Sequence, residues 1–145
     1  MPKYISTVRT DAAPAQVWPL VADLTRHGEW SADDVTVSPA TGGGYESVAT
    51  AKGREFRARL DVLASAEPSR FAFRATDATG TYEHEFALVP DGTGTTVTRT
   101  ITATNLSPAQ RLLFYAVLPV VKKPSARRSL ERLAALAETT STRSR

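Results

Sequence analysis

A histidine and a tyrosine stand in an apolar row of the segment 80–90, which alternates in the manner of a β-strand. The residues of this row are Tyr82, His84, Phe86 and Leu88. Because alternate residues of a strand share a face, His84 is expected on a core-facing surface, where it would titrate near neutral pH. In one interpretation His84 and Tyr82 bind a ligand or act as acid and base in catalysis. In the other, His84 is bonded to Tyr82 or to backbone, or lies at a solvent-exposed rim.

An arginine occupies a second apolar row, in the segment 96–105. The residues of this row are Val97, Arg99, Ile101 and Ala103. A guanidinium that is buried and unpaired would cost on the order of several kcal/mol. Arg99 must therefore reach solvent, pair with a carboxylate side chain, or hold an anionic group of a ligand. The third possibility predicts a ligand with a polar head and an apolar body.

The acidic segment 23–34 is predicted not to form a metal site. Asp23 and His27 have a spacing that would suit two ligands on one helix, but the other histidine of the chain, His84, belongs to a distant strand. We interpret these residues as solvated loop charges and helix caps. The glycines at 42–44 lack the lysine and hydroxyl residue of a phosphate-binding loop, and they predict a turn instead. The sequence thus predicts no metal and no cofactor.

Aromatic and aliphatic residues on several predicted elements are candidates for the wall of a ligand-binding site. Residues of this kind line pockets and also form ordinary cores, so both interpretations remain open. Together with Tyr82, His84 and Arg99, the candidate ligand-binding residues are Trp30, Phe56, Leu60, Phe71, Phe73, Phe86, Phe114, Tyr115 and Leu118.

Strands and two short helical pieces account for the first two thirds of the chain. Alternation and β-branched or aromatic content predict strands within the segments 3–10, 35–51, 54–68, 70–76, 80–90 and 96–105. Between the first two segments, apolar residues at helical spacing follow Pro14, which suits a first helical turn. Pro19 predicts that this helix is short or broken, with two pieces that meet near Thr25.

The segment 108–138 is predicted to be one long helix that begins after Ser107, which can cap it. Pro119 and Pro124 each remove a hydrogen bond within the helix, so bends are expected there. Its second half carries a stripe of apolar residues spaced by three and four, namely Leu130, Leu133, Ala134 and Ala137. Antiparallel strands with one apolar face must bury that face, and this helix is the large apolar element that remains. The sheet is therefore expected to wrap around the helix and to leave a cavity between them.

Composition indicates one globular domain. The chain has 145 residues, of which 41% are hydrophobic and 23% charged. We expect the domain over residues 1–138 and a disordered basic tail over 139–145. The absence of cysteine excludes disulfides and thiolate chemistry and fits a cytoplasmic location. No signal-peptide pattern opens the sequence, and the most apolar run, 112–121, is too short to cross a bilayer.

Charge patterning argues against a nucleic-acid partner. The net charge is +3, and many basic residues cluster between Lys122 and Arg132 without a nucleic-acid-reading motif. We interpret this basic stretch as a solvated helix face, with transient contact to anionic lipid headgroups as the alternative. Elsewhere, Arg57 and Arg59 can form solvated ion pairs with Glu83 and Glu85 on the outer surface of the sheet if their strands lie near each other.

The order of these elements and several short stretches resemble the START/polyketide-cyclase superfamily (SRPBCC), whose fold is also called helix-grip or birch-pollen-allergen-like. The stretches are "APAQVWPLVADLTRHGEW" at 13–30, the glycines 42–44, "FALVPDGTGTTVT" at 86–98 and "RRSLERLAALAE" at 127–138. The resemblance covers residues 4–138 and is closest to the polyketide cyclase/dehydrase and lipid-transport branch. It implies an α+β fold in which a curved antiparallel sheet of about six or seven strands surrounds a long, bent C-terminal helix, with two short helices after the first strand.

Members of this superfamily hold lipids, sterols, polyketides or plant hormones between sheet and helix, and some are cyclases or dehydratases. They share no catalytic motif, so the resemblance assigns no catalytic residue here. The leading hypothesis is a protein that binds or carries a hydrophobic or amphipathic small molecule, lipid-like or polyketide-like. The alternative is a cyclase or dehydratase that uses His84 and Tyr82 as acid and base.

Overall fold

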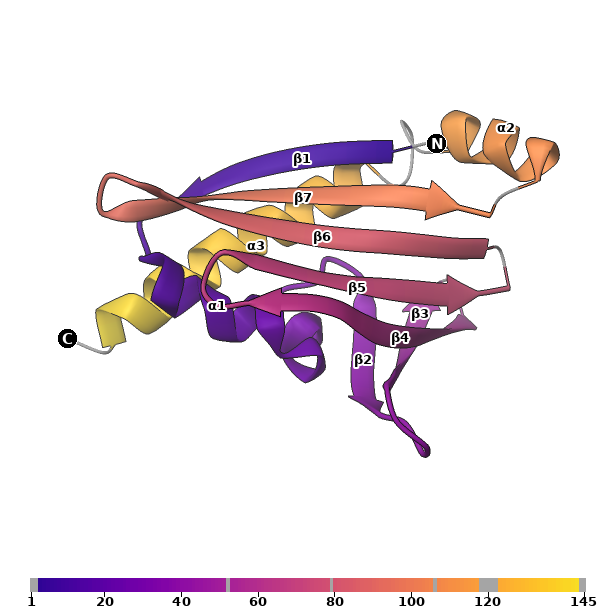
Figure 1. Ribbon diagram of the computed structural model, residues 1–145, viewed down its shortest axis with the longest axis horizontal. Coiled ribbons are helices and arrows are strands. Elements are labelled where there is room, and N and C mark those ends of the chain that lie inside the picture. The colour runs from indigo at the N-terminus through magenta and orange to yellow at the C-terminus, as the bar shows by residue number, and fades with distance from the viewer. Residues whose placement is uncertain (1–2, 52, 79, 106, 118–122, 144–145) are drawn as a thin grey trace.

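The computed structural model shows one curved antiparallel sheet with helices on its concave side (Figure 1). It describes residues 3–51, 53–78, 80–105, 107–117 and 123–143, with the backbone alone at 51, 113–117, 123–124 and 140–143. The seven strands within these residues are β1 (Lys3–Thr10), β2 (Asp34–Pro39), β3 (Tyr45–Ala51), β4 (Arg54–Ala66), β5 (Arg70–Asp77), β6 (Gly80–Asp91) and β7 (Gly94–Thr104). The helices are α1 (Pro14–Ala22), the 3-10 helix η1 (Leu24–Glu29), α2 (Pro108–Val117) and α3 (Lys123–Arg143).

The sheet has the strand order β1-β7-β6-β5-β4-β3-β2, so the first strand pairs with the last. The other neighbours are consecutive in sequence and form antiparallel pairs. Glycines 42–44 all have positive φ, between 70° and 105°, and make the turn from β2 to β3. The predicted strands, this turn and the α+β helix-grip fold are confirmed.

The first helical region is divided in two, as Pro19 predicts. Pro14 occupies the first turn of α1, where its missing N–H removes no hydrogen bond. Asp23 separates the two pieces and caps η1, because its carboxylate accepts a hydrogen bond from the backbone N–H of Thr25 at 3.0 Å. The buried side of α1, which includes Val17 and Leu20, covers one end of the concave side of the sheet.

The apolar stripe of α3 packs as its spacing predicts. Its members are buried, and they are Leu130, Leu133, Ala134 and Ala137. The helix lies along β1 and against α1. Thr10 ties β1 to it by donating a hydrogen bond to the carbonyl of Ala134 at 3.0 Å, and Glu138 accepts one from the backbone N–H of Asp11 at 2.9 Å.

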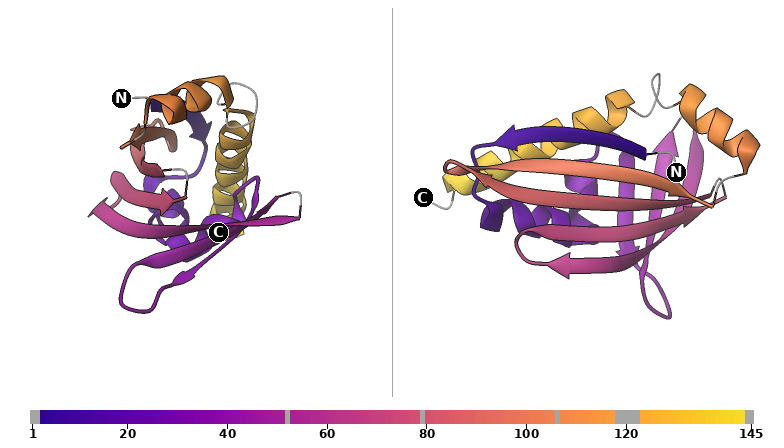
Figure 2. Two further views of the ribbon diagram at one scale, coloured as in Figure 1. Left: turned by 90° about the vertical axis from the view of Figure 1, so that its right-hand side faces the viewer. Right: turned by 45° about the horizontal axis from the view of Figure 1, so that its top comes forward.

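The single bent helix expected over 108–138 is wrong, because the structure has two separate helices there. Figures 1 and 2 show α2 beyond the end of β7, whereas α3 crosses the concave side of the sheet. Pro124 lies in the first turn of α3, where proline is tolerated, so it begins a helix rather than bending one. Pro119 lies outside the described residues. The helix also continues to Arg143. Disorder of the tail over 139–145 stays a prediction.

Two segments distant in sequence close the concave side. Figure 2 shows the ends of the sheet curling toward the side on which α3 lies, with β1 at one end and the β2–β3 pair at the other. The helix η1 packs on β2, and α3 on β1.

Among the described residues, no helix is long and apolar enough to cross a membrane.

Candidate functional site

Strand register divides the central strands into two faces with different chemistry. We call the side of the sheet that carries Phe86 and Val97 the inner face and the side that carries Glu85 the outer face. On the inner face, one cross-strand row consists of Phe71, Phe86, Arg99 and Ser6, and the next consists of Phe73, His84, Ile101 and Tyr4. The structure thus brings Arg99 and His84 together, as two neighbouring polar positions in an apolar surface.

Arg99 is held by three contacts. Its Nη2 donates a hydrogen bond to Nδ1 of His84 at 3.1 Å. Its guanidinium carbon lies 5.2 Å from the ring centroid of Phe86 and 6.0 Å from that of Trp30, within the range of cation–π attraction. These contacts position the guanidinium against aromatic rings rather than against a carboxylate.

Two polar atoms beside this contact are shielded from solvent and unpartnered. Nε of Arg99 and Oγ of Ser6 have no hydrogen-bond partner within the part of the chain that the structure describes. The two residues face each other across the β1–β7 pair. A shielded donor without a partner costs on the order of 1–3 kcal/mol, and more when it is charged. This position is therefore a costly one to leave without a polar partner.

The charge of Arg99 has no direct counter-ion among the residues described. Burial lowers the pKa of Arg99 to about 10, while Asp33 and Tyr4 act in the opposite direction. Asp33 forms no ion pair with Arg99 in the described structure, and its carboxylate accepts a hydrogen bond from Ser125 at 2.9 Å. At neutral pH Arg99 therefore remains a cation inside a mostly apolar surface.

His84 is stacked and oriented by its neighbours. Its ring lies parallel to that of Phe73, with centroids 4.6 Å apart and an interplanar angle of 6°. Because a guanidinium can only donate, Nδ1 of His84 must be the acceptor of the bond from Arg99. The arrangement therefore requires a His84 ring that is unprotonated at Nδ1 and carries its proton at Nε2.

The interpretation of His27 as a solvated loop residue is wrong. His27 is 8% exposed, and its Nε2 donates a hydrogen bond to the carbonyl of Val21 at 2.7 Å. Its ring packs against the aromatic rings of Trp30 and Phe73. Burial lowers the pKa of His27 to about 4, and the charge of Arg99 adds to this, while the bond to Val21 opposes it. His27 is thus a neutral part of the core, and no group of metal-ligating residues occurs among those described.

The sequence-predicted wall is assembled in part. The candidates that are buried are Trp30, Leu60, Phe71, Phe73 and Phe86, and Tyr82 and His84 are partly buried. Phe56 is 55% exposed and lies near the start of β4, away from the row of Arg99. The side chains of Phe114 and Tyr115, and the whole of Leu118, lie outside the described residues. Whether any of these residues touches a ligand stays a prediction.

Ser6 was missed by sequence reasoning. Its strand was predicted, but its position became informative only once β1 was paired with β7 and Ser6 came to face Arg99. A signal was present, since Tyr4, Ser6 and Val8 alternate with Lys3, Ile5 and Thr7. Ser6 is the small polar residue between Tyr4 and Val8 on this face, and that pattern indicates a polar position in the apolar surface.

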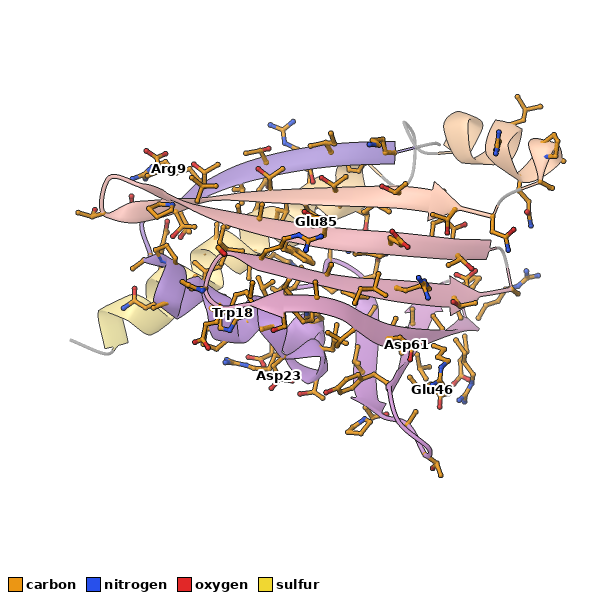
Figure 3. All side chains as sticks on the ribbon, in the orientation of Figure 1. Arg9, Trp18, Asp23, Glu46, Asp61 and Glu85 are labelled. Carbon is orange, nitrogen blue, oxygen red and sulfur yellow. The ribbon has the colours of Figure 1, made fainter. Side chains whose placement is uncertain are left out.

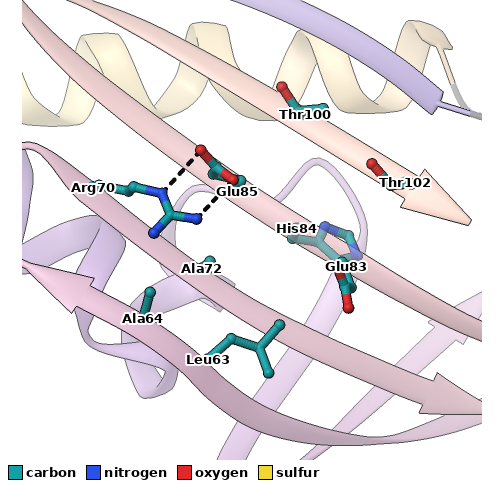
Figure 4. Close-up of a pocket in the computed structure, with 9 residues that line it drawn as sticks. All are labelled: Leu63, Ala64, Arg70, Ala72, Glu83, His84, Glu85, Thr100 and Thr102. Carbon is teal, nitrogen blue, oxygen red and sulfur yellow. Dashed lines mark hydrogen bonds and ion pairs between the residues drawn. The ribbon is translucent and has the colours of Figure 1, made fainter. Parts of the chain in front are cut away.

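The outer face carries a groove of about 210 Å³. Figure 4 shows it beside the ion pair in which Arg70 Nε donates to Glu85 at 3.1 Å. The residues that line it are Leu63, Ala64, Arg70, Ala72, Glu83, His84, Glu85, Thr100 and Thr102. His84 borders the groove although its ring stacks on Phe73 of the inner face. This groove lies on the side of the sheet opposite to the expected cavity, so the cavity between sheet and helix stays a prediction.

Comparison with known proteins supports a fold seen in several bacteria. Residues 1–138 match the sequence model of the family described as polyketide cyclase / dehydrase and lipid transport. A crystal structure from Thermus thermophilus, TTHA0849, is similar with a TM-score of 0.74 at 22% identity, covering 97% of this chain and 99% of that one. CV1439 from Chromobacterium violaceum gives 0.75 at 18% identity, covering 95% and 99%. The comparison with curated proteins gave no match.

Proposed function

Because the chain belongs to the polyketide cyclase / dehydrase and lipid transport family, we propose that it binds and carries a hydrophobic or amphipathic small molecule. The site is the inner face of the sheet, in a cavity between the sheet and the C-terminal helical segment. Apolar burial, at roughly 25 cal/mol per Å² of surface removed from water, supplies the driving force. A few polar groups fix the orientation of the ligand, as in most small-molecule sites.

The observation that carries this proposal is that two shielded polar atoms, Nε of Arg99 and Oγ of Ser6, have no hydrogen-bond partner among the described residues. A domain that needed only a stable core would gain by placing an apolar residue at Arg99. The rings of Trp30 and Phe86 lie beside Arg99, and Phe73 stacks on His84 in the next row. An apolar wall with a small polar patch is what an amphipathic ligand requires.

Native mass spectrometry of the purified full chain tests binding directly. We expect a co-purifying mass that is lost after extraction with organic solvent and regained when the extract is returned. Ile101→Trp, which fills space next to His84 on the inner face, is expected to reduce the bound fraction at least about tenfold. Thr100→Trp, one residue away on the outer face, is the matched control and should leave it unchanged. Absence of any bound mass, together with no uptake of added lipid, would contradict the proposal.

A second candidate function is a cyclase or dehydratase, favoured by the orientation of His84. The bond from Arg99 fixes which ring nitrogen carries the proton, as acid–base catalysis requires. Tyr82 lies two residues before His84, on the same face of β6. His84→Ala is expected to abolish turnover of a bound substrate while leaving its dissociation constant within about threefold. Unchanged turnover in this variant would contradict the role of His84 in catalysis, and the carrier function would be the candidate that remains.

A further inference from the structure

We infer that the ligand carries a carboxylate, and that this head group is held by Arg99 and Ser6 on the inner face. The inference rests on the proposed function, since it names the chemical class of the molecule bound at that site. It goes beyond what family membership implies, since the family is described by polyketides and lipids and no charged head group is specified.

The first step of the argument is charge. Arginines of the outer face have carboxylate partners in the same sheet, as Arg70 has in Glu85 and Arg57 in Glu46. Arg99 has no ion pair within the described residues, although it is the arginine that burial penalises most. Asp33, the carboxylate that acts on it electrostatically, is bonded to Ser125. A negative charge supplied by a ligand would complete this site.

The second step is donor geometry. His84 accepts the bond from Nη2 of Arg99, and the rings of Phe86 and Trp30 lie near the guanidinium. Nε of Arg99 then remains as a shielded donor, and the hydroxyl of Ser6 stands opposite on β1. Two donors from adjacent strands match the two oxygens of one carboxylate.

The third step is the size of the charge. Arg99 contributes one positive charge, and its surroundings are aromatic and weakly solvated. A phosphate ester with about two negative charges would be left with one buried and uncompensated, which is costly. A monoanion is neutralised by Arg99 alone. The apolar wall beside it accepts an alkyl or aromatic body, so the ligand class is a hydrophobic monocarboxylic acid.

The experiment compares acids with neutral analogues of the same body on the full chain. The probes are decanoate, methyl decanoate and 1-decanol, and 2-naphthoate with its methyl ester, titrated by calorimetry at pH 7. We expect each acid to bind at least about tenfold more tightly than its neutral analogues, the difference that one charge-assisted hydrogen bond makes. The ¹⁵N signal of Arg99 Nε should shift on titration with acid and stay in place with ester.

Variants separate the head-group contact from the wall. Arg99→Met is expected to lower the affinity for acids about tenfold to a hundredfold and to leave the affinity for esters unchanged. Arg99→Lys keeps the charge without the forked donor and should fall between the two. Ser6→Ala should weaken acid binding several-fold. Arg70→Met, on the outer face, is the matched control and should bind all probes as the original protein does. Thermal unfolding of each variant checks that it is folded.

The outcomes distinguish the two proposals. Equal affinity for acids and esters would overturn the carboxylate assignment and leave the carrier function in place. Selectivity for acids that survives in a folded Arg99→Met variant would overturn it as well. Failure of every probe and of the co-purification experiment would overturn the proposed function itself.

Discussion

Arginine side chains have different environments on the two faces of the sheet. On the outer face, guanidinium groups lie beside carboxylates of adjacent strands, with Arg57 to Glu46 at 2.7 Å and Arg70 to Glu85 at 3.1 Å. Figure 3 labels Glu85 on β6 and Glu46 near the β3–β4 pair. On the inner face, Arg99 lies beside a histidine and two aromatic rings.

The difference shows where stability and function each reside. The outer pairs are solvated, and solvent screening leaves them little energy to contribute. The contact of Arg99 with His84 is shielded from solvent, so a charge there that lacks a counter-ion lowers the free energy of unfolding. A costly charge without a protein counter-ion is better explained by binding than by folding. Three measurements compare the two faces, and a fourth tests His27 of η1, whose ring packs against Phe73 and Phe86 of the inner face.

Phe86→Ala should show the largest effect, because Phe86 is fully buried on the inner face of β6. We expect a loss of about 3–5 kcal/mol in the free energy of unfolding, measured by urea denaturation. Glu85→Ala, one residue earlier and on the outer face, is the control and should cost much less. Equal losses in the two variants would mean that the faces do not differ as described.

Acid should destabilise the protein through His27. Its pKa is lowered to about 4 by burial, so the unfolded chain takes up the proton first as the pH falls through 6.5. The stabilisation is complete above pH 6.5 and is lost between pH 6.5 and 4, about 3 kcal/mol in total and about half of it by pH 5. His27→Gln should flatten the slope between pH 6.5 and 5. A slope that remains in this variant would assign the effect to another group.

Arg99→Met should raise the free energy of unfolding of the ligand-free protein by about 1–2 kcal/mol, since it removes a shielded charge and fills the space with apolar atoms. Arg70→Met on the outer face should give a slight decrease instead. Denaturation curves of both variants, recorded after extraction of bound lipid, make the measurement. A destabilised Arg99→Met would show that the arginine is structural and that the two faces use arginine for the same purpose.

The outer pair should show the smallest effect. A double-mutant cycle on Arg70 and Glu85 should give a coupling near the limit of measurement at 0.15 M salt and none at 1 M. The hydrogen bond from Arg70 is the main reason why the pKa of Glu85 lies below its ordinary value, so Arg70→Met should raise it. NMR titration of the Glu85 carboxyl provides the reading. A strong coupling that persists at high salt would contradict the description of this face as solvated.

Most of the fold followed from local patterns. Alternation marked the strands, the glycines at 42–44 the first hairpin turn, and the spacing of Leu130 and Leu133 the buried stripe of α3. The pairing of the strands could not be predicted in this way, because alternation shows which residues share a face and does not show which strands are neighbours. Ion pairs of Arg57 and Arg59 with Glu83 and Glu85 require β4 and β6 to be neighbours, but β5 lies between those strands, and Arg57 pairs with Glu46.

The candidate site could be predicted only in outline. Arg99 was conspicuous, because an arginine in an apolar row is rare enough to be noticed. Its partners come from β6 and β1, and only the three-dimensional structure shows that His84 accepts its bond and that Ser6 faces it. His27 was misjudged, since burial of a histidine in a short helix depends on long-range packing that no local pattern reveals. The carriage of a ligand and contact of Lys122–Arg132 with membranes remain predictions.

The pairing of β1 with β7 has a consequence for synthesis on the ribosome. The hydroxyls of Thr7 and Thr98 lie 3.3 Å apart although 91 residues separate them in the chain. Strands β2 to β7 can form as successive hairpins while they emerge, but β1 must wait until Thr104 has left the exit tunnel. Non-local pairing of this kind is slow, on the order of milliseconds to seconds. The strand of this sheet that is made first is therefore among the last to pair, and its apolar residues Ile5 and Val8 stay accessible to a chaperone during that interval.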